Sequence, residues 1–299
     1  MSDALSPERT IFVVDDDLVI QQLMTALLAE FGAVEVAGSG EEALEKVAVK
    51  KPDLIVLDVE MPGMDGYEVC TRLKADESVS DIPVIFLTSS NTNEDEEHGL
   101  EIGATDFIRK PISPRIVYAR VSNILKLQAA TRELEILATT DSLTGAYNRR
   151  HFMEVGNMEL HRSIRYGQSF TVAMLDIDHF KAVNDTYGHG VGDIALKRTV
   201  QVIQDVLRNE DTLGRLGGEE FAVIFPQTDL DGAGLVAERI RESIGEIVVD
   251  TPLGDLRFTM SIGLSSGGGK DSDIEEALKR ADQALYSAKE LGRNRVICA

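Results

Sequence analysis

Two glycines and two acidic residues stand together at Gly217–Glu220, directly ahead of the apolar run Phe221–Phe225. The preceding segment Asp211–Leu216 has strand character, so the glycines predict a tight hairpin, because glycine tolerates positive φ. Acidic residues are poor strand formers. Glu219 and Glu220 are therefore either ordinary solvated turn residues or carboxylates that hold a metal ion where a phosphate can approach the backbone.

A second acidic segment favours the metal site. The strand-like run Phe170–Leu175 ends in Asp176–Asp178. A carboxylate here that faces one on an adjacent hairpin would form a paired Mg²⁺ site, and Mg²⁺ would bring a triphosphate to an acidic protein. Downstream, Lys181, Asn184 and Asp193 add a cation, an amide and a carboxylate. Asparagine and aspartate together suit the edge of guanine, which offers both donors and an acceptor.

Polar residues also follow the apolar runs of the first half of the chain: Asp15, Asp16, Asp58, Thr88 and Lys110. In a parallel sheet the carboxyl ends of the strands share one edge, so these side chains can converge. Clustered carboxylates bind a hard divalent cation, and a carboxylate beside that cation can accept a phosphoryl group. Taken singly, an aspartate after a strand is often a helix N-cap, and Lys-Pro is often a turn.

The elements that would position these residues differ between the two halves. Through about residue 125, short apolar runs alternate with amphipathic stretches such as Leu18–Glu30 and Glu41–Val49, which predicts an α/β, doubly wound parallel sheet. From about Asp141, helices and strands do not alternate simply, so we expect an antiparallel or mixed sheet. The predicted strands of the first half are Ile11–Val14, Val34–Ala37, Leu54–Leu57, Val84–Leu87 and Asp106–Ile108.

Four helices and one further strand are expected in the second half. The strand covers Arg257–Leu264, and the helices cover Arg149–Tyr166, Gly192–Leu207, Gly232–Ile244 and Ile274–Leu291.

Between the halves, Ser113–Thr140 lacks glycine and, after Pro114, lacks proline, which predicts one long helix. Apolar and small residues recur in it at alternating spacings of three and four, as in a coiled coil. The stripe either forms a dimer stalk or packs on its own domain. Its members are Ile124, Leu127, Thr131, Leu134 and Ala138.

Composition limits the partners. The 299 residues carry a formal net charge of -21, which repels nucleic acid and anionic lipid. No apolar run approaches the roughly 20 residues of a membrane helix, and the first residues do not resemble a signal peptide. Two distant cysteines, Cys70 and Cys298, make no disulfide framework, so we expect a cytoplasmic protein. The acidity and the lack of a basic reading helix oppose a DNA-binding regulator.

Residues 8 to about 125 resemble the receiver domain of two-component response regulators, a flavodoxin-like (CheY-like) fold, and Asp58–Gly66 matches the acceptor loop of that family. The resemblance implies that Asp58 accepts the phosphoryl group from a histidine kinase. It makes Asp15, Asp16 and Asp58 ligands of one Mg²⁺, and assigns switch roles to Thr88, Phe107 and Lys110.

The second half, from about Asp141 to Val296, resembles the GGDEF family of diguanylate cyclases, an α+β, palm-like fold. The resemblance rests on Asp141–Gly145, Asn148–Arg150, the Asp176–Asp193 block and the Gly217–Phe221 turn, where Glu219 replaces the aspartate of the family name. Ala146-Tyr147 departs from the usual pattern. We expect a receiver domain over 1–125, a stalk over 113–140 and a cyclase domain over 141–299.

The resemblance implies roles for the second set of residues. Asp176, Glu219 and the Ile177 carbonyl would hold Mg²⁺, one or two ions per GTP, with Mn²⁺ as a substitute, and Glu220 would help to activate the 3′-hydroxyl. Asn184 and Asp193 would read guanine. The phosphate contacts would be Lys181, Lys289 and Arg293.

The implied reaction joins two GTP molecules into cyclic di-GMP. Because each domain holds one GTP, a homodimer, or a tetramer as in some members, is required. Arg208 and Asp211 match the inhibitory RxxD motif of the family, with Arg239 as a second contact from a neighbouring subunit. Two alternatives remain open: a domain that only binds nucleotide, and an enzyme that makes mixed guanine–adenine dinucleotides.

Overall fold

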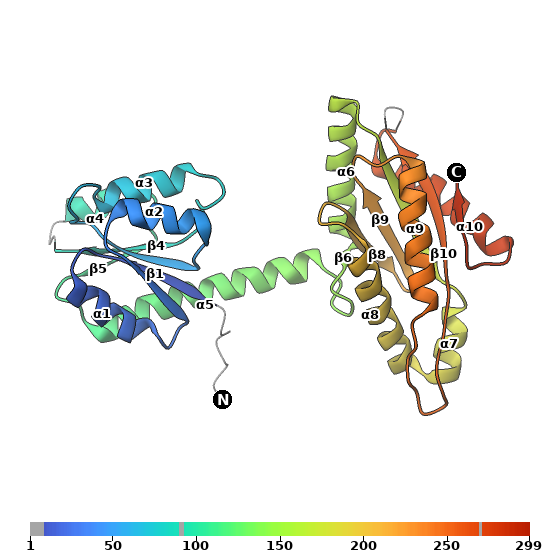
Figure 1. Cartoon of the computed structure of the whole chain (residues 1–299), viewed down its shortest axis with the longest axis horizontal. Helices are drawn as coiled ribbons and strands as arrows, with labels where there is room; N and C mark the ends of the chain where they lie inside the picture. The colour runs from blue at the N-terminus through green and yellow to red at the C-terminus, as the bar shows by residue number, and fades with distance from the viewer. Residues whose placement is uncertain (1–8, 90–92, 269–270) are drawn as a thin grey trace. The chain divides into compact units, whose positions relative to one another are not determined.

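The chain folds into two compact units, Met1–Arg132 and Glu133–Ala299, in a computed structural model that describes residues 9–89, 93–268 and 271–299 (Figure 1). Each unit has its own sheet and its own core. No helix within the described ranges combines the length and the apolar character needed to cross a bilayer.

The first unit is a parallel five-stranded sheet in the order β2-β1-β3-β4-β5, which confirms the predicted doubly wound fold. Helices α2 (Gly40–Val49) and α3 (Gly66–Ala75) cover one face, and α1 (Leu18–Leu28) and α5 (Pro114–Thr139) cover the other (Figure 1). Because both faces are covered, the central strands are buried along their whole length. The remaining elements are β1 (Thr10–Val14), β2 (Ala33–Ala37), β3 (Leu54–Asp58), β4 (Val84–Thr88), α4 (Asn93–Glu101) and β5 (Asp106–Arg109).

The second unit contains a six-stranded sheet in the order β11-β10-β7-β9-β8-β6, and its mixed pairing agrees with the predicted antiparallel or mixed sheet. Its central strands are antiparallel, and the two edge strands pair in parallel with their neighbours. The strands are β6 (Tyr147–Asn148), β7 (Phe170–Ile177), β8 (Thr212–Gly217), β9 (Glu220–Phe225), β10 (Met260–Gly267) and β11 (Val296–Cys298).

Two helical layers cover this sheet. Helices α6 (Arg149–Tyr166) and α10 (Ile274–Glu290) pack on the face that carries Val172 and Met174 of β7. Helices α7 (Phe180–Tyr187), α8 (His189–Val206) and α9 (Leu230–Gly245) pack on the opposite face, which carries Ala173 and Leu175. The alternation along β7 places Asp176 on the same face as α10.

Three predicted helix and strand boundaries differ from the structure by three residues, and the others by no more than two. Helix α8 begins at His189, three residues before Gly192, because α7 ends at Tyr187 and Gly188 alone separates the two helices. Strand β10 begins at Met260 and not at Arg257, because Leu256 instead forms a bridge with Val249. The strand continues to Gly267, which pairs with Phe170 at the start of β7.

Helix α5 confirms the long helix predicted between the halves. Of its apolar stripe, Ile124 is buried in the first unit, whereas Leu127 is 68% exposed and Leu134 is 66% exposed. The alternative that the stripe packs on its own domain therefore holds only for its first member.

Close packing of α10 on β10 requires glycine at position 263. A Cβ atom there would lie 2.1 Å from the carbonyl oxygen of Ala281 and 2.2 Å from the backbone nitrogen of Leu285. We predict that Gly263→Ala destabilises the second unit by about 3 kcal/mol, at the upper end for overpacking, because backbone atoms cannot turn away. Denaturant unfolding measures this change.

Gly234→Ala is the matched control, because Gly234 lies inside α9 and its Cβ would meet nothing within 4 Å. That variant should be neutral or stabilising, by up to about 1 kcal/mol. Equal stability of the two variants would contradict the packing argument.

Candidate functional sites

The acidic residues of the first unit converge at the carboxyl ends of β1 and β3, which are neighbours in the sheet. Asp15 and Asp58 are buried and Asp16 is exposed, and one ligand atom from each lies within 4.8 Å of the others. Three carboxylates at this spacing fit a hard divalent cation, which prefers oxygen ligands.

Lys110 completes this cluster. Its Nζ lies 2.9 Å from Asp58 Oδ1 and 3.3 Å from Asp15 Oδ2. Burial raises the pKa of the Asp58 carboxyl; Lys110 acts against this, and the charge on Asp15 adds to it. Burial alone would lower the pKa of Lys110, but the two carboxylates outweigh it and the pKa is raised. The ammonium of Lys110 therefore lies beside the Asp58 carboxylate, whose charge would be costly to bury without a partner.

The other predicted residues of the first unit lie on the neighbouring strands. Thr88 is buried at the end of β4, where it pairs in register with Arg109 of β5. Phe107 is half-buried on β5, and the guanidinium of Arg120 lies 5.2 Å from the centre of its ring. Thr88 thus shares the carboxyl edge of the sheet with Asp58, whereas Phe107 packs against the core cluster that contains Phe86 and Ala104.

In the second unit, the carboxylates predicted to bind a metal meet at the end of β7. Asp176 is buried and lies opposite Glu220 in the register of β7 and β9, while Ile177 is the last residue of β7. Lys289 Nζ, from the last turn of α10, lies 2.8 Å from Asp176 Oδ2. Burial raises the pKa of Asp176, Lys289 opposes this shift, and the charges of Glu219 and Glu220 raise the pKa further. The register of β7 and β9 therefore brings the acidic end of β7 beside the acidic turn.

The turn itself depends on its glycines and on an arginine. Gly217 and Gly218 have φ values of 156° and 52°, which favour glycine. Arg215 donates two hydrogen bonds to the carbonyl oxygen of Gly218, from Nε at 2.9 Å and from one terminal nitrogen at 2.7 Å. Its other terminal nitrogen donates to Asp141 Oδ1 at 2.8 Å. The sequence reasoning missed Arg215, for which its position two residues before Gly217 was the available signal.

The residues predicted to read guanine are brought together by a close contact between α7 and α8. A Cβ atom at Gly192 would lie 2.0 Å from Asn184 Oδ1, so the side chain of Asn184 reaches the first turn of α8, beside Asp193. Lys181 is exposed on α7, three residues before Asn184, and therefore on the same side of that helix. These three side chains present an amide, a carboxylate and a cation.

Arg293 follows α10 in a left-handed conformation with φ 64° and is half-buried. Lys289 and Arg293 are thus separated by a single tight turn at the end of α10.

Arg208 and Asp211 lie before β8 and both line a cavity of about 340 Å³, together with Tyr147 and Gln204. The contact between the pair runs through the backbone, because the N–H of Arg208 donates to Asp211 Oδ2 at 2.9 Å. Arg239 is exposed on α9 and donates to the carbonyl oxygen of Val206, at the end of α8. Within one chain, Arg239 therefore contacts the backbone of α8.

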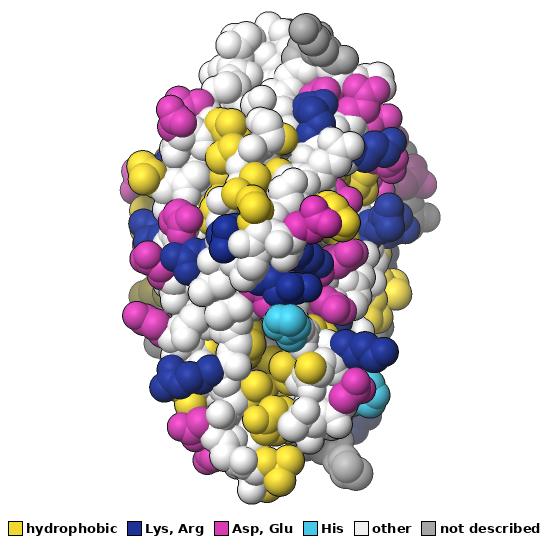
Figure 2. Space-filling model, turned by 90° about the vertical axis from the view of Figure 1, so that its right-hand side faces the viewer, with side chains coloured by type: hydrophobic (Ala, Val, Ile, Leu, Met, Phe, Trp, Pro, Cys, Tyr) yellow, Lys and Arg dark blue, Asp and Glu magenta, His cyan; other side chains and the backbone are white. Residues whose placement is uncertain are grey.

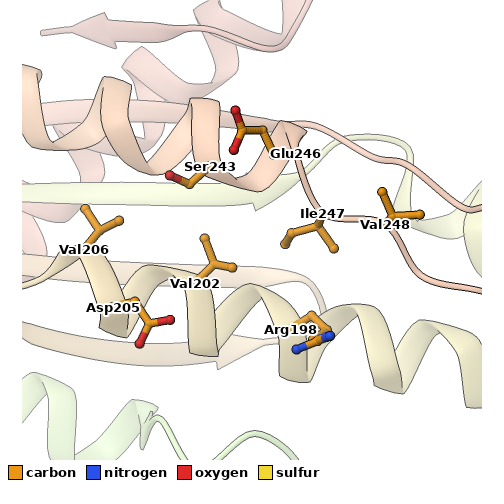
Figure 3. Close-up of a pocket in the computed structure, with 8 residues that line it drawn as sticks. All are labelled: Arg198, Val202, Asp205, Val206, Ser243, Glu246, Ile247 and Val248. Atoms are coloured by element: carbon orange, nitrogen blue, oxygen red, sulfur yellow. The ribbon is translucent and has the colours of Figure 1, made fainter.

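Surface shape and charge do not by themselves locate these sites. A cavity of about 420 Å³ lies between α8 and the end of α9 (Figure 3), and none of the predicted site residues lines it. On the face drawn in Figure 2, Lys and Arg side chains are interspersed with Asp and Glu side chains. Cations for an anionic ligand are thus available locally despite the net charge of -21.

Comparison with known proteins identifies both units. The family described as "Diguanylate cyclase, GGDEF domain" matches residues 138–295, and the family described as "Response regulator receiver domain" matches residues 11–122. The response regulator PleD of Caulobacter vibrioides is 32% identical over 97% of this chain, which spans 65% of that protein. Diguanylate cyclase A of Treponema denticola is 30% identical over 85% of this chain and 71% of its own length.

Solved structures agree with these matches. The GGDEF domain of DgcB from Caulobacter crescentus, in complex with c-di-GMP, is 35% identical and superposes with a TM-score of 0.52 over 54% of this chain and 93% of that one. Diguanylate cyclase SiaD from Pseudomonas aeruginosa, in complex with its activator SiaC, is 40% identical, with a TM-score of 0.53 over 60% of this chain and 70% of that one. The chain therefore belongs to the GGDEF family of diguanylate cyclases and carries, ahead of its GGDEF domain, a response regulator receiver domain.

Proposed function

We propose that the chain is a diguanylate cyclase that condenses two GTP molecules into cyclic di-GMP and two pyrophosphates. The observation that carries the proposal is the acidic site at the end of β7. There Asp176 lies opposite Glu220 and forms an ion pair with Lys289, and the charge of Glu219 raises the pKa of Asp176. Buried carboxylates beside an exposed turn, with a lysine at hand, suit a metal-bound triphosphate.

The oxygen set at this site fits Mg²⁺, with Mn²⁺ as a substitute. Asp176, Glu219 and the carbonyl of Ile177 would hold the ion, which when bound neutralises charge on the transferring phosphate. Lys181, Lys289 and Arg293 would contact the phosphates, and Glu220 would help to take the proton from the attacking 3′-hydroxyl. Asn184 would both accept from and donate to the guanine edge, and Asp193 would accept from its N–H groups, which favours GTP over an adenine nucleotide.

One chain would provide half of the catalytic arrangement. The 3′-hydroxyl of one GTP must reach the α-phosphate of another, so two GGDEF domains must face each other, and their proximity becomes the controlled quantity. The exposed side chains of Leu127 and Leu134 on α5 support pairing of two chains along this helix, in a dimer or within a tetramer.

The receiver domain would supply the control. Asp58 would accept a phosphoryl group from a histidine kinase, with Asp15 and Asp16 holding Mg²⁺ and with Thr88, Phe107 and Lys110 reporting the change. Kinase and nucleotide would both be met in the cytoplasm.

Cyclic di-GMP would inhibit at the cavity lined by Arg208 and Asp211, because a guanidinium and a carboxylate can bind a guanine edge and a phosphate. Arg239 of a neighbouring subunit would add a contact.

Removal of one metal-binding carboxylate tests the proposed activity. The wild-type chain, given GTP and Mg²⁺, should release cyclic di-GMP, identified by mass spectrometry. Asp176→Asn should lower turnover by at least about a hundredfold, because the bound metal supplies several kcal/mol of charge stabilisation.

Glu246→Gln, which changes a carboxylate at the cavity of Figure 3, is the matched control and should keep full turnover. A wild-type chain that binds GTP without turning it over would identify a nucleotide-binding module instead. A mixed guanine–adenine product would refute strict use of GTP.

The contact between α7 and α8 tests the guanine site separately. In Gly192→Ala the new methyl group would displace the Asn184 side chain, whose amide oxygen stands 2.0 Å from the added atom. We predict a rise in KM for GTP of roughly tenfold, as expected for the loss of one hydrogen bond of about 1.4 kcal/mol, with no loss of secondary structure.

Gly190→Ala serves as the comparison, because its Cβ would meet nothing within 4 Å. An unchanged KM in Gly192→Ala would contradict the assignment of Asn184 to the guanine edge.

A further inference from the structure

Asp178 stands two residues beyond Asp176 and looks in sequence like a second metal ligand, but its carboxylate is already engaged. It is 4% exposed. Its Oδ1 accepts from Ser261 Oγ at 2.7 Å, and its Oδ2 accepts from Thr259 Oγ1 at 2.6 Å and from the backbone N–H of Asn294 at 3.1 Å. A carboxylate offers roughly four acceptor positions, so three donors leave little capacity for a cation.

The third of these donors belongs to an unusual turn. Gly292, Arg293 and Asn294 have successive φ values of 111°, 64° and 47°. For residues other than glycine the left-handed conformation costs roughly 1–2 kcal/mol each, so two such residues in a row need outside support. The N–H of Arg293 donates to the carbonyl oxygen of Ala288, which ties the turn to α10. The N–H of Asn294 turns toward the sheet, where Asp178 and Ser261 Oγ accept it.

This turn follows the lysine that pairs with Asp176 and carries a second cationic side chain. Lys289, in the last turn of α10, pairs with Asp176, and Arg293 lies within the turn itself. Asp178 thus joins three elements at one point: the end of β7, strand β10 through Ser261, and the segment that leaves α10.

We propose that Asp178 is a positioning residue for the triphosphate: by accepting the N–H of Asn294 it holds the Gly292–Asn294 turn against β7 and so places Arg293 and Lys289 beside Asp176. The inference rests on the proposed function of this site. It separates the two acids of the Asp-Ile-Asp segment, since Asp176 faces the ligand and Asp178 supports the cations that receive it.

The proposal predicts a selective loss. The contacts of the Asp178 carboxylate lie on β10, on the residue just before it and on the turn after α10, whereas Asn184 and Asp193 lie on α7 and α8. Binding of the phosphates should therefore depend on Asp178, and binding of the guanine should not.

Two unreactive probes separate these contributions: guanosine, which lacks phosphates, and 3′-deoxy-GTP, which lacks the attacking hydroxyl. With the full chain and Mg²⁺, Asp178→Asn should weaken calorimetric binding of 3′-deoxy-GTP by at least about tenfold, because hydrogen bonds to a charged group contribute on that scale. Guanosine binding should stay within about twofold. Asp205→Asn, an exposed carboxylate on α8, should change neither.

An unchanged affinity of Asp178→Asn for 3′-deoxy-GTP would overturn the proposal, and so would equal losses for both probes, which indicate general damage to the domain. If Asp178→Asn does not fold, Ser261→Ala carries the same test, because Ser261 Oγ both donates to Asp178 and accepts from Asn294.

Turnover of GTP by the wild-type chain is measured beside these titrations. A wild-type chain that makes no cyclic di-GMP, combined with a selective loss in Asp178→Asn, would refute the proposed function and leave the positioning role standing. Cyclic di-GMP production without a selective loss would do the reverse.

Discussion

A lysine held against a buried aspartate at the carboxyl end of a strand is the interaction on which both halves of this protein depend. In the receiver domain Lys110 lies 2.9 Å from Asp58, and in the GGDEF domain Lys289 lies 2.8 Å from Asp176. Burial raises the pKa of each aspartate, and neighbouring carboxylates raise it further, so each site would repel an anionic ligand without nearby cations. In a chain of net charge -21, this local pairing places a cation where an anionic ligand would need one.

The scaffold serves these two pairs. Parallel strands bring Asp15, Asp58 and Thr88 to one edge in the first unit, whereas in the second unit the antiparallel pairing of β7 with β9 sets Asp176 opposite Glu220. The lysines come from later in the chain, one after β5 and one in the last turn of α10. Each site is therefore complete only when distant segments have folded together, which links its chemistry to the integrity of its own unit.

Residues at strand ends were predictable because apolar runs of strand length mark where each strand stops. Asp58 and Asp176 were identified in this way, and the strand and helix patterns indicated both sheets. The position of Arg215 beside the turn was visible in the sequence, but its contact with Asp141 was not. The contacts of Asp178 with Ser261 and Asn294 also join segments that lie far apart in the chain, so they were not predictable. Strands β6 and β11 have two and three residues, too few to show alternation.

In the proposed function one chain would provide half of an enzyme, the exposed leucines on α5 would pair two chains, and Asp58 would control that pairing. The direct test is specific activity with GTP and Mg²⁺ as a function of protein concentration, with and without acetyl phosphate. We predict that activity per chain rises with protein concentration. Acetyl phosphate should change the concentration at which activity rises in the wild type but not in Asp58→Ala. Activity per chain that is independent of concentration would contradict the proposed function.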